Sequence, residues 1–458
     1  MKIIIAGSGQ VGSHLAKLLS YESQEITLID SNDEKLTFPN SQLDIKVIEG
    51  DCTSTSVLHK ANISDTDLFV GVTSSESVNL TACYLARKLG ARKTIARISN
   101  PELIEDKNID FSDLGISELI SPEILTSKEI SMVVNRAEFT DPFEFDDGAL
   151  ITLGLSATHT STFVGKTVVE AAGIFPETHF FPISIKRDDK TIIPRGDTVF
   201  HSGDHIVFMT EPGGEEELLK LSGQNNGEIK NVMILGGGRV GKKVAEDLSA
   251  ENINVKLVES NKHRAEVLAE DLSDCLIIYG DGTNSELLEE ENLGQMDAFI
   301  AVTGDSETNI MSSLIAKSKG ITKTIALVDN LDYYKLTQIS GIDTLINKKL
   351  LAADAISKHV HKAEIIAISQ LDNMDAELLE FVVNEDSEVC NKEVKTLDFP
   401  RCAIIAGVIR DGEGYIVLGD FKILNQDRVV VCCLKAVSYT HLRAHETLRY
   451  LVCRLLLE

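Results

Sequence analysis

The chain has 458 residues, enough for about three or four domains of ordinary size. Hydrophobic residues make up 43% of the sequence, which is typical of packed globular cores and excludes a largely disordered chain. There are 44 Lys and Arg residues against 71 Asp and Glu residues, and the resulting formal net charge of −27 argues against nucleic acid as a partner.

The sequence predicts neither a membrane span nor a secretory signal. No run of about 18 apolar residues occurs, and the chain starts with a short apolar stretch that leads directly into glycines, as a buried strand does. The eight Cys residues are scattered and form no CxxC pair, so neither a zinc site nor a disulfide framework is expected. We therefore expect a cytoplasmic protein.

Residues 1–135 alternate short apolar strands with amphipathic helices. This alternation predicts parallel βαβ units in which helices cover both faces of the sheet. The expected strands are 3–6, 26–29, 46–48, 68–72 and 94–98, and a helix is expected at 11–19. The pattern changes at 145–212, where Gly, Asp and Pro turns separate strands expected at 149–155, 181–186 and 205–209. A small α+β domain is therefore expected there.

The second half of the chain repeats the first. Residues 3–12 (IIIAGSGQVG) reappear as 232–241 (VMILGGGRVG), and the first glycines are 236 − 7 = 229 positions apart. The expected fold is therefore α/β, with two Rossmann-like doubly wound parallel-sheet domains, each followed by a small α+β domain. The expected boundaries are 1–135 and 231–360 for the Rossmann-like domains, 136–215 and 361–436 for the small domains, and 216–230 for a polar linker.

A GxGxxG fingerprint follows the first strand and opens the first helix in each half. Its first glycine makes a tight turn, its second lets the backbone approach a pyrophosphate, and its third lets the helix pack on the strand. The helix N-terminus then presents free N–H groups to phosphate. The alternative is a glycine turn that only packs a helix on a strand. The residues assigned to the two loops are Gly7, Gly9, Gln10, Val11 and Gly12, and Gly236, Gly238, Arg239, Val240 and Gly241.

An acidic residue stands 23 positions after the first glycine in each half, at Asp30 and Glu259. At the end of the second strand, such a carboxylate can accept both ribose hydroxyls, and it disfavours a 2′-phosphate. Neither acid is followed directly by Arg. We therefore expect NAD(H) or a simple adenine nucleotide such as ATP or ADP, rather than NADP. The two sites need not share a ligand or an affinity.

Further candidate ligand contacts end the later strands. Asp51 and Asp281 follow a glycine after the third strand, where they could lie beside the adenine or begin a helix as its N-cap. Thr73 and Thr303 end the fourth strand and could border the ligand or cap the strand end. Arg97 ends the fifth strand and could reach a phosphate or lie at the surface; its counterpart in the second half is a leucine.

The acid–base residues of a hydride-transferring enzyme are not evident. Such an enzyme needs a substrate domain with an acid–base residue, and no His in the Rossmann-like units recurs at a matching position. No Ser–His–Asp grouping, HExxH or P-loop motif is apparent. These residues favour a ligand-binding module without catalysis. The alternatives are an NAD-dependent oxidoreductase and a scaffold with vestigial glycine loops.

Taken together, the motifs resemble those of a known family. Each half has strand–GxGxxG–helix, an acid, Gly-Asp and Val-Thr…Asn, and the first continues into IPRGDT at 193–198 and GDH at 203–205. This combination resembles an RCK/KTN unit. Two such units in one chain resemble the TrkA family, the regulatory subunits of Trk potassium uptake systems. The resemblance covers about residues 1–435.

The resemblance implies a cytosolic protein that binds NAD(H) and adenine nucleotides. Its partner would be a membrane potassium channel subunit of Trk type, on the inner face of the plasma membrane, whose opening it would control. The family forms rings of eight units, so four chains would suffice as a homotetramer. The implied site residues are the loop glycines with Asp30, Asp51, Thr73 and Arg97 in the first half, and with Glu259, Asp281 and Thr303 in the second.

Residues 437–458 lie beyond the repeat. They carry two His and three Arg in 22 residues of a chain that is otherwise strongly acidic. Two interpretations stay open: a non-native extension, or an amphipathic helix that docks on a partner.

Overall fold

The structure, a computed structural model, describes residues 1–20, 24–106, 108–173, 179–188, 190–223, 229–329, 333, 341–359, 365–371, 374–397 and 399–434. The chain divides into two compact units, Met1–Asn135 with Glu228–Val360, and Arg136–Gly227 with His361–Glu458. Each unit therefore combines one segment from each half of the repeat. Within the described ranges, no helix is long and apolar enough to cross a membrane. The tail at 437–458 lies outside the described residues.

The first sheet of unit 1 has six parallel strands in the order β3-β2-β1-β4-β5-β6. Its strands are β1 (Lys2–Ala6), β2 (Glu25–Asp30), β3 (Lys46–Glu49), β4 (Leu68–Gly71), β5 (Lys93–Arg97) and β6 (Glu118–Ile120). The helices are α1 (Gln10–Ser20), α2 (Asp33–Gln42), α3 (Thr55–Lys60), α4 (Glu76–Lys88), α5 (Glu102–Glu105) and α6 (Pro122–Asn135). The strand order reverses between β1 and β4, which is where ligands bind in such sheets.

The second sheet of unit 1 repeats this arrangement, in the order β14-β13-β12-β15-β16-β17. Its strands are β12 (Asn231–Leu235), β13 (Asn254–Glu259), β14 (Cys275–Tyr279), β15 (Ala298–Ala301), β16 (Lys323–Leu327) and β17 (Thr344–Ile346). The described helices are α9 (Arg239–Ala250), α10 (Lys262–Asp271), α11 (Ser285–Glu290), α12 (Ser306–Ser318) and α14 (Lys348–Lys358). The predicted pair of doubly wound parallel sheets is confirmed.

Burial explains the sequence pattern of these sheets. Helices cover both faces, so the central strands are apolar at successive positions rather than at alternate ones. In β1, Ile3, Ile4 and Ile5 are each at most 2% exposed. In α1, by contrast, the buried Leu15 and Leu19 recur at helical spacing on one face.

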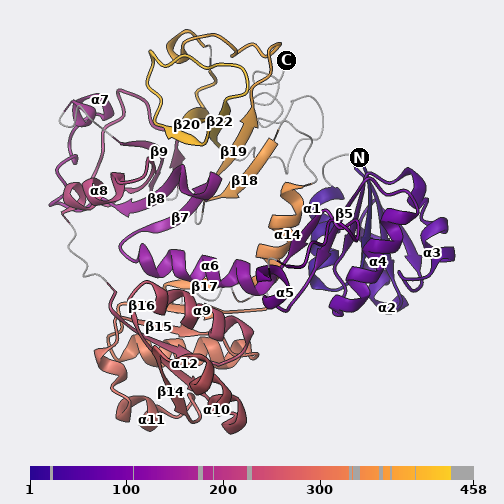
Figure 1. Ribbon diagram of the computed structural model, residues 1–458. Coiled ribbons are helices and arrows are strands. Elements are labelled where there is room, and N and C mark those ends of the chain that lie inside the picture. The colour runs from indigo at the N-terminus through magenta and orange to yellow at the C-terminus, as the bar shows by residue number, and fades with distance from the viewer. Residues whose placement is uncertain are drawn as a thin grey trace. The chain divides into compact units, whose positions relative to one another are not determined.

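The two Rossmann-like domains exchange their last helices. Helix α6 belongs to the first half of the sequence, yet Ile130 and Val134 lie in the core of the second sheet. Helix α14 belongs to the second half, yet Ala353 and Ile356 lie in the core of the first. Figure 1 shows α14 beside α1 and α6 beside α9. Each expected Rossmann-like domain therefore gives its last helix to the core of the other, while the expected boundaries at 135 and 360 coincide with borders between the two units.

Unit 2 holds the small domains, each with a five-stranded antiparallel sheet. The first has the order β10-β9-β11-β8-β7, and the second has the order β18-β19-β22-β20-β21. The elements of the first are β7 (Thr140–Phe145), β8 (Leu150–Ser156), α7 (Val168–Ala172), β9 (Phe180–Arg187), β10 (Lys190–Ile192), β11 (His205–Thr210) and α8 (Gly214–Ser222). The strands of the second are β18 (Ile365–Gln370), β19 (Ala376–Val382), β20 (Ala403–Arg410), β21 (Glu413–Tyr415) and β22 (Arg428–Leu434).

The segment expected to be a polar linker, 216–230, is partly helical. Its first residues belong to α8, whose Leu218 and Leu221 are buried with Phe163 and Phe208 in the core of the first small domain. The expectation of a linker was therefore wrong for 216–222. Three consecutive Glu residues made the segment look like a polar linker. They occupy the first turn of α8, where negative charge favours a helix.

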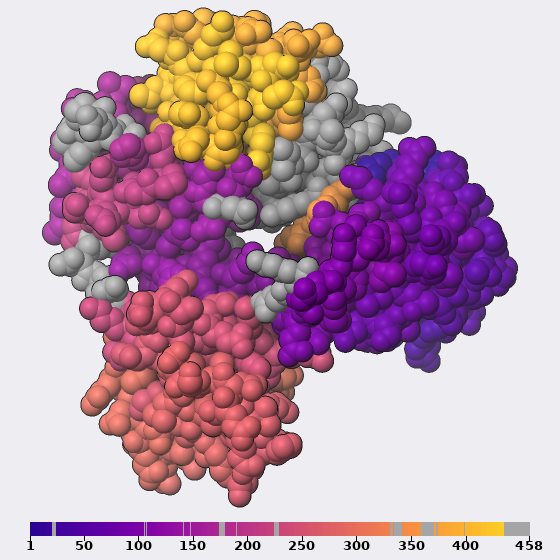
Figure 2. Space-filling view, viewed as in Figure 1, coloured from indigo at the N-terminus to yellow at the C-terminus, as the bar shows by residue number. Residues whose placement is uncertain are grey.

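The two small domains of unit 2 share an apolar core in addition to the separate core of each domain. Phe145 and Met209 from the first domain pack with Leu378 and Val430 from the second. Figure 2 shows the yellow and orange residues of the second domain against the magenta residues of the first. Arg195, the arginine of the IPRGDT motif, adds hydrogen bonds of 2.8 Å to two backbone carbonyls of the second domain, those of residues 400 and 403.

Candidate functional site

The first glycine loop joins β1 to α1 at the carboxyl edge of the sheet. Gly7 has φ = +111°, a conformation that side chains disfavour, and a Cβ there would lie 2.9 Å from the backbone nitrogen of Thr73. A Cβ at Gly12 would lie 1.8 Å from the Gly7 carbonyl oxygen. At Gly9, by contrast, no described atom beyond its two chain neighbours lies within 4 Å of the Cβ position. Gly7 and Gly12 therefore have the expected turn and packing geometry, and the approach of a pyrophosphate to the open space beside Gly9 stays a prediction.

The second loop has the same geometry. Gly236 has φ = +106°, and a Cβ there would lie 2.9 Å from the backbone nitrogen of Thr303. A Cβ at Gly241 would lie 1.8 Å from the Gly236 carbonyl oxygen, and the space beside Gly238 is open among the described atoms. Both loops thus leave an unobstructed stretch of backbone directly before a helix N-terminus, which is the arrangement that binds phosphate.

The other predicted loop residues divide by exposure. Gln10 and Arg239 begin α1 and α9 and are exposed, so their side chains can reach a ligand. Val11 and Val240 are 4% and 5% exposed and belong to the apolar cores. Any contact between these valines and a ligand would therefore come from their backbone N–H groups.

The two acids bind the glycine loops. Asp30 Oδ2 accepts a 2.7 Å hydrogen bond from the Ser8 N–H, and Asp30 Oδ1 accepts a 2.9 Å hydrogen bond from the Asn32 N–H. Glu259 makes the equivalent bonds to the N–H groups of Gly237 and Asn261, at 3.0 and 2.6 Å. Each acid therefore stands at the end of its second strand beside the loop, where a ribose would lie.

The two acids differ in what else surrounds them. Asp30 is only partly buried, whereas the Glu259 side chain is 4% exposed. The Arg264 guanidinium lies over Glu259, with Nη1 3.4 Å from Oε2. A Cβ at Gly237 would lie 2.9 Å from the same Oε2, so the longer glutamate occupies space next to a loop residue without a side chain. In the first half, the shorter Asp30 leaves room for Ser8.

Asp51 and Asp281 form turns rather than helix caps. Asp51 Oδ1 accepts hydrogen bonds of 2.8 Å from both the N–H and the hydroxyl of Thr53. These bonds, the backbone one first, lower the pKa of Asp51, and Thr283 does the same for Asp281. Helix α3 has its N-cap at residue 54 and α11 at residue 284. Of the two alternatives, the N-cap role therefore does not apply, the position beside the adenine stays a prediction, and both aspartates are exposed near the carboxyl edge.

Thr73 and Thr303 are held by buried asparagines. The hydroxyl and the N–H of Thr73 donate to Asn79 Oδ1 at 2.6 and 2.8 Å. Asn79 Nδ2 in turn donates to the backbone carbonyls of Thr73 and Arg97, at 3.2 and 2.8 Å. Asn309 makes the same four bonds to Thr303 and to the carbonyl of residue 327. This network ties the ends of two strands together and supports the strand-end role for both threonines.

Arg97 is half-buried at the end of β5, and its Nε atom is buried without a hydrogen-bond partner among the described residues. An unpaired buried guanidinium N–H is costly, so it marks a position where a ligand oxygen would be favourable. This setting differs from the exposed surface position that was the alternative. The counterpart Leu327 is 6% exposed and apolar.

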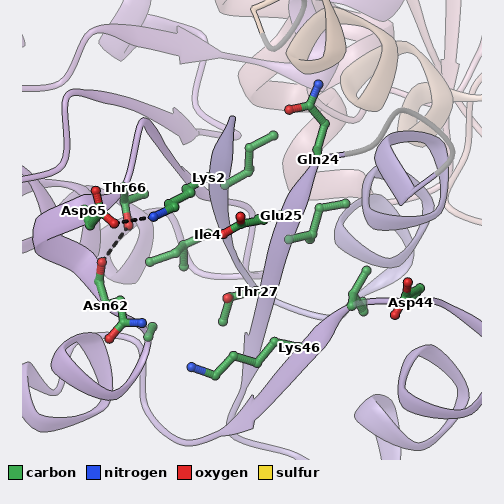
Figure 3. Close-up of a pocket in the computed structure, with 14 residues that line it drawn as sticks. Lys2, Ile4, Gln24, Glu25, Thr27, Asp44, Lys46, Asn62, Asp65 and Thr66 are labelled. Atoms are coloured by element: carbon green, nitrogen blue, oxygen red, sulfur yellow. Dashed lines mark hydrogen bonds and ion pairs between the residues drawn. The ribbon is translucent and has the colours of Figure 1, made fainter.

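A separate cavity of about 410 Å³ lies at the opposite, amino edge of the first sheet. Figure 3 shows Lys2, Glu25 and Lys46, each of which begins a strand, around this cavity. None of the predicted site residues lines it. It is therefore distinct from the glycine loop, where the sequence places the ligand chemistry.

Sequence reasoning missed two residues of the second site. The Arg264 guanidinium lies over the Glu259 carboxylate, and the missing side chain at Gly237 leaves space for that carboxylate. The signal was present in the alignment of the repeats, where Ser8 and Lys35 stand in place of Gly237 and Arg264. Only the structure shows that these changes meet at one carboxylate.

Comparison with known proteins assigns the family. The family model described as the TrkA-N domain matches residues 3–122 and 232–348, and the TrkA-C domain model matches residues 155–223 and 378–438. The chain belongs to the TrkA family. The family assignment agrees with the resemblance inferred from the motifs.

Relatives of the TrkA family match along almost their whole length. The Trk system potassium uptake protein TrkA of Vibrio alginolyticus is 31% identical, over 96% of this chain and 97% of its own. A TrkA homologue of Methanosarcina mazei is also 31% identical, over 96% and 98%. The TrkA protein of Haemophilus influenzae is 32% identical, over 94% and 95%.

Two solved structures share the fold of this chain. The crystal structure of the GsuK RCK domain superposes with a TM-score of 0.61 over 94% of this chain and 92% of that chain, at 17% identity. A structure named as the GsuK channel bound to NAD gives the same TM-score over 94% of this chain and 76% of that chain. At this identity the likeness establishes the fold alone.

Proposed function

We propose that this chain is a nucleotide-binding regulatory subunit of a potassium transport system. Membership of the TrkA family supports the regulatory role, because near full-length relatives carry the name of a Trk potassium uptake protein. The observation that carries the nucleotide-binding part is the open space beside Gly9 and Gly238, each directly before a helix N-terminus. The first and third glycines of each motif are packed against backbone, so the open position is specific to the middle glycine.

The first site fits NAD(H) or an adenine nucleotide. The backbone at Gly9 and the start of α1 would hold the phosphates, and Asp30 would accept hydrogen bonds from the ribose hydroxyls. The unpaired Arg97 Nε would donate to a phosphate or ribose oxygen. Asp51 follows β3, the neighbour of β2, and Thr73 follows β4, the neighbour of β1, and both would border the ligand. In the second site the corresponding residues are Gly238, Glu259, Asp281 and Thr303.

The exchanged helices provide a route from each site to the rest of the chain. Helix α1 begins at the first glycine loop and packs against α14, which leads into the second small domain. Helix α9 begins at the second loop and packs against α6, which leads into the first small domain. A nucleotide in one half therefore acts on the helix that continues into the small domain of the other half. Regulation by this route requires two arrangements of the domains in equilibrium. A nucleotide shifts that equilibrium only if it binds the two arrangements with different affinity.

The partner would be a membrane potassium channel subunit of Trk type. The chain would sit on the inner face of the membrane through this protein rather than through lipid, because its net charge of −27 repels anionic headgroups. Two related units per chain favour a closed ring of four chains, in which eight units repeat around one axis. Opening or closing of the pore would follow rearrangement of this ring.

Isothermal titration calorimetry on the full chain tests this proposal. The ligands are NADH, NAD, ATP and ADP, and the matched variants are Gly9→Val and Gly238→Val, which place a side chain in the open space of one loop each. Wild type should bind a nucleotide at both loops, and each variant should lose one site. An NAD-dependent oxidoreductase would instead consume NADH with a small metabolite. Absence of binding by all four ligands would favour a scaffold and overturn the proposal.

A further inference from the structure

The two glycine loops have the same backbone geometry, but the helices that follow the two acids carry opposite charges. These helices begin beside the place where the ribose would lie. Helix α2 follows the first acid and opens with Asp33-Glu34-Lys35, a formal charge of −2 + 1 = −1. Helix α10 follows the second acid and opens with Lys262-His263-Arg264, a charge of +2 with neutral His. All six side chains are exposed. Each helix is capped by an asparagine, Asn32 or Asn261, so the same backbone presents opposite charges.

The second acid is also less available than the first. Asp30 accepts hydrogen bonds from two backbone N–H groups and remains partly exposed. Glu259 accepts from two backbone N–H groups and from Arg264 Nη1, and its side chain is 4% exposed. The carboxylate that should repel a phosphate is thus enclosed by protein, and the exposed group beside it is the Arg264 guanidinium, whose side chain is 52% exposed.

The enclosure of Glu259 follows from the loop sequence. A Cβ at Gly237 would lie 2.4 Å from Leu268 Cδ1 and 2.9 Å from Glu259 Oε2, so a side chain at 237 would displace both. In the first half the equivalent Ser8 is buried, and its hydroxyl donates to the Lys35 carbonyl at 2.9 Å. Glycine, the longer acid and the arginine therefore form one arrangement, which the first loop lacks.

In Rossmann folds, an acid at the end of the second strand binds the ribose 2′-hydroxyl, and a nearby Arg accommodates a 2′-phosphate. We propose that the second site takes an adenine nucleotide carrying a phosphate on its ribose 2′-oxygen, and that Arg264 with Lys262 selects it. The first site, with Asp30 open and Asp33 and Glu34 beside it, takes the unphosphorylated ribose. This inference rests on the proposed function, because it assumes that both loops bind nucleotides.

The experiment compares 5′-ADP with 2′,5′-ADP on the full chain by calorimetry, reading one site at a time. In Gly9→Val only the second loop is open, and there 2′,5′-ADP should bind at least about tenfold more tightly than ADP, as expected for one charge-assisted contact. In Gly238→Val only the first loop is open, and there ADP should bind more tightly than 2′,5′-ADP.

Arg264→Ala in the Gly9→Val background should abolish the preference for 2′,5′-ADP. Lys35→Ala, the matched change in the Gly238→Val background, should leave the first-site preference unaltered. A circular-dichroism melt of each variant checks that it is folded. If the second site binds ADP and rejects 2′,5′-ADP as the first does, the inference is wrong and the proposed function stands. If neither variant binds either compound, the nucleotide-binding function itself is overturned.

Discussion

Gly12 faces the carbonyl oxygen of Gly7 so closely that a Cβ on Gly12 would lie 1.8 Å from that oxygen. Gly9, in the same loop, faces open space. Gly12→Val should therefore destabilise the chain by roughly 3 kcal/mol or more through backbone collision. Gly9→Val should change the unfolding free energy by less than about 1 kcal/mol while preventing nucleotide binding to the first loop.

Urea unfolding and calorimetry on the same samples separate these two effects. Gly238→Val and Gly241→Val provide the matched pair in the second loop, where a Cβ at Gly241 would also lie 1.8 Å from a carbonyl oxygen. If Gly9→Val were as destabilising as Gly12→Val, the space beside Gly9 would not be open, and the loop would have a packing role only.

The Asp30 carboxylate should contribute directly to nucleotide affinity. Asp30→Ala removes a charged acceptor for the ribose hydroxyls, and we expect a loss of about 1.5–3 kcal/mol in binding free energy. The measurement is a titration with ADP in the Gly238→Val background, so that only the first site is read. Unchanged affinity with an intact fold would remove Asp30 from the site.

The exchange of α6 and α14 predicts that a residue of the second half stabilises the first. Ile356 is 0% exposed and packs in the core of the first sheet, so Ile356→Ala should cost about 2–4 kcal/mol. Hydrogen exchange should then rise in β1 and α1. Ile300→Ala, in the core of the second sheet, is the matched control and should raise exchange in β12 and α9 instead. If Ile356→Ala increased hydrogen exchange only in the second half, the packing of α14 against the first sheet would be contradicted.

Much of the fold and of the loops could be predicted from the sequence because the determinants are local. The turn at Gly7 needs positive φ, and the strand before it is apolar because both faces of the sheet are covered. These constraints act within a few residues and leave a readable pattern. The repeat made the pattern stronger, since two independent copies carry the same glycines.

The rest depends on contacts between residues far apart in the chain. Apolar spacing shows that α14 buries a face, but it does not show that Ile356 meets the first sheet rather than its own. Similarly, Glu259 looks equivalent to Asp30 in sequence, and its enclosure by Arg264 appears only when α10 is placed beside the loop. Arg97 was assigned correctly to a strand end, but its buried, unpaired Nε could not be foreseen.

The proposed ring predicts a defined mass in solution. Four chains of 50.1 kDa give about 200 kDa, which light scattering after size exclusion measures directly. The expected result is a homotetramer with and without nucleotide. A stable monomer under both conditions would contradict control of a channel by ring rearrangement and shift weight toward the oxidoreductase or scaffold alternatives.

Each small domain carries a buried aspartate that is paired with a partly exposed arginine, and this pair predicts a specific acid sensitivity. Arg187 donates to both oxygens of Asp204 at 2.7 and 2.8 Å, and Arg410 does the same to Asp427 at 2.7 Å. Both aspartate side chains are 1% exposed. Burial alone would raise the pKa of Asp204, but the bonds from Arg187 and from the His201 N–H outweigh it and lower the pKa.

Because its folded pKa lies below the unfolded value of about 4, Asp204 stabilises the chain fully above that pH. This contribution is lost as the pH falls from about 4 through the folded pKa, because between these two values the unfolded chain binds a proton that the folded chain does not. Asp204→Asn should cost about 3 kcal/mol at pH 7, because it leaves Arg187 without its anion. The melting temperature of this variant should also fall less between pH 5 and pH 3 than that of the wild type. Asp188→Asn, an exposed neighbour, is the control, and an equal acid dependence in all three proteins would show that the Asp204 pair does not set it.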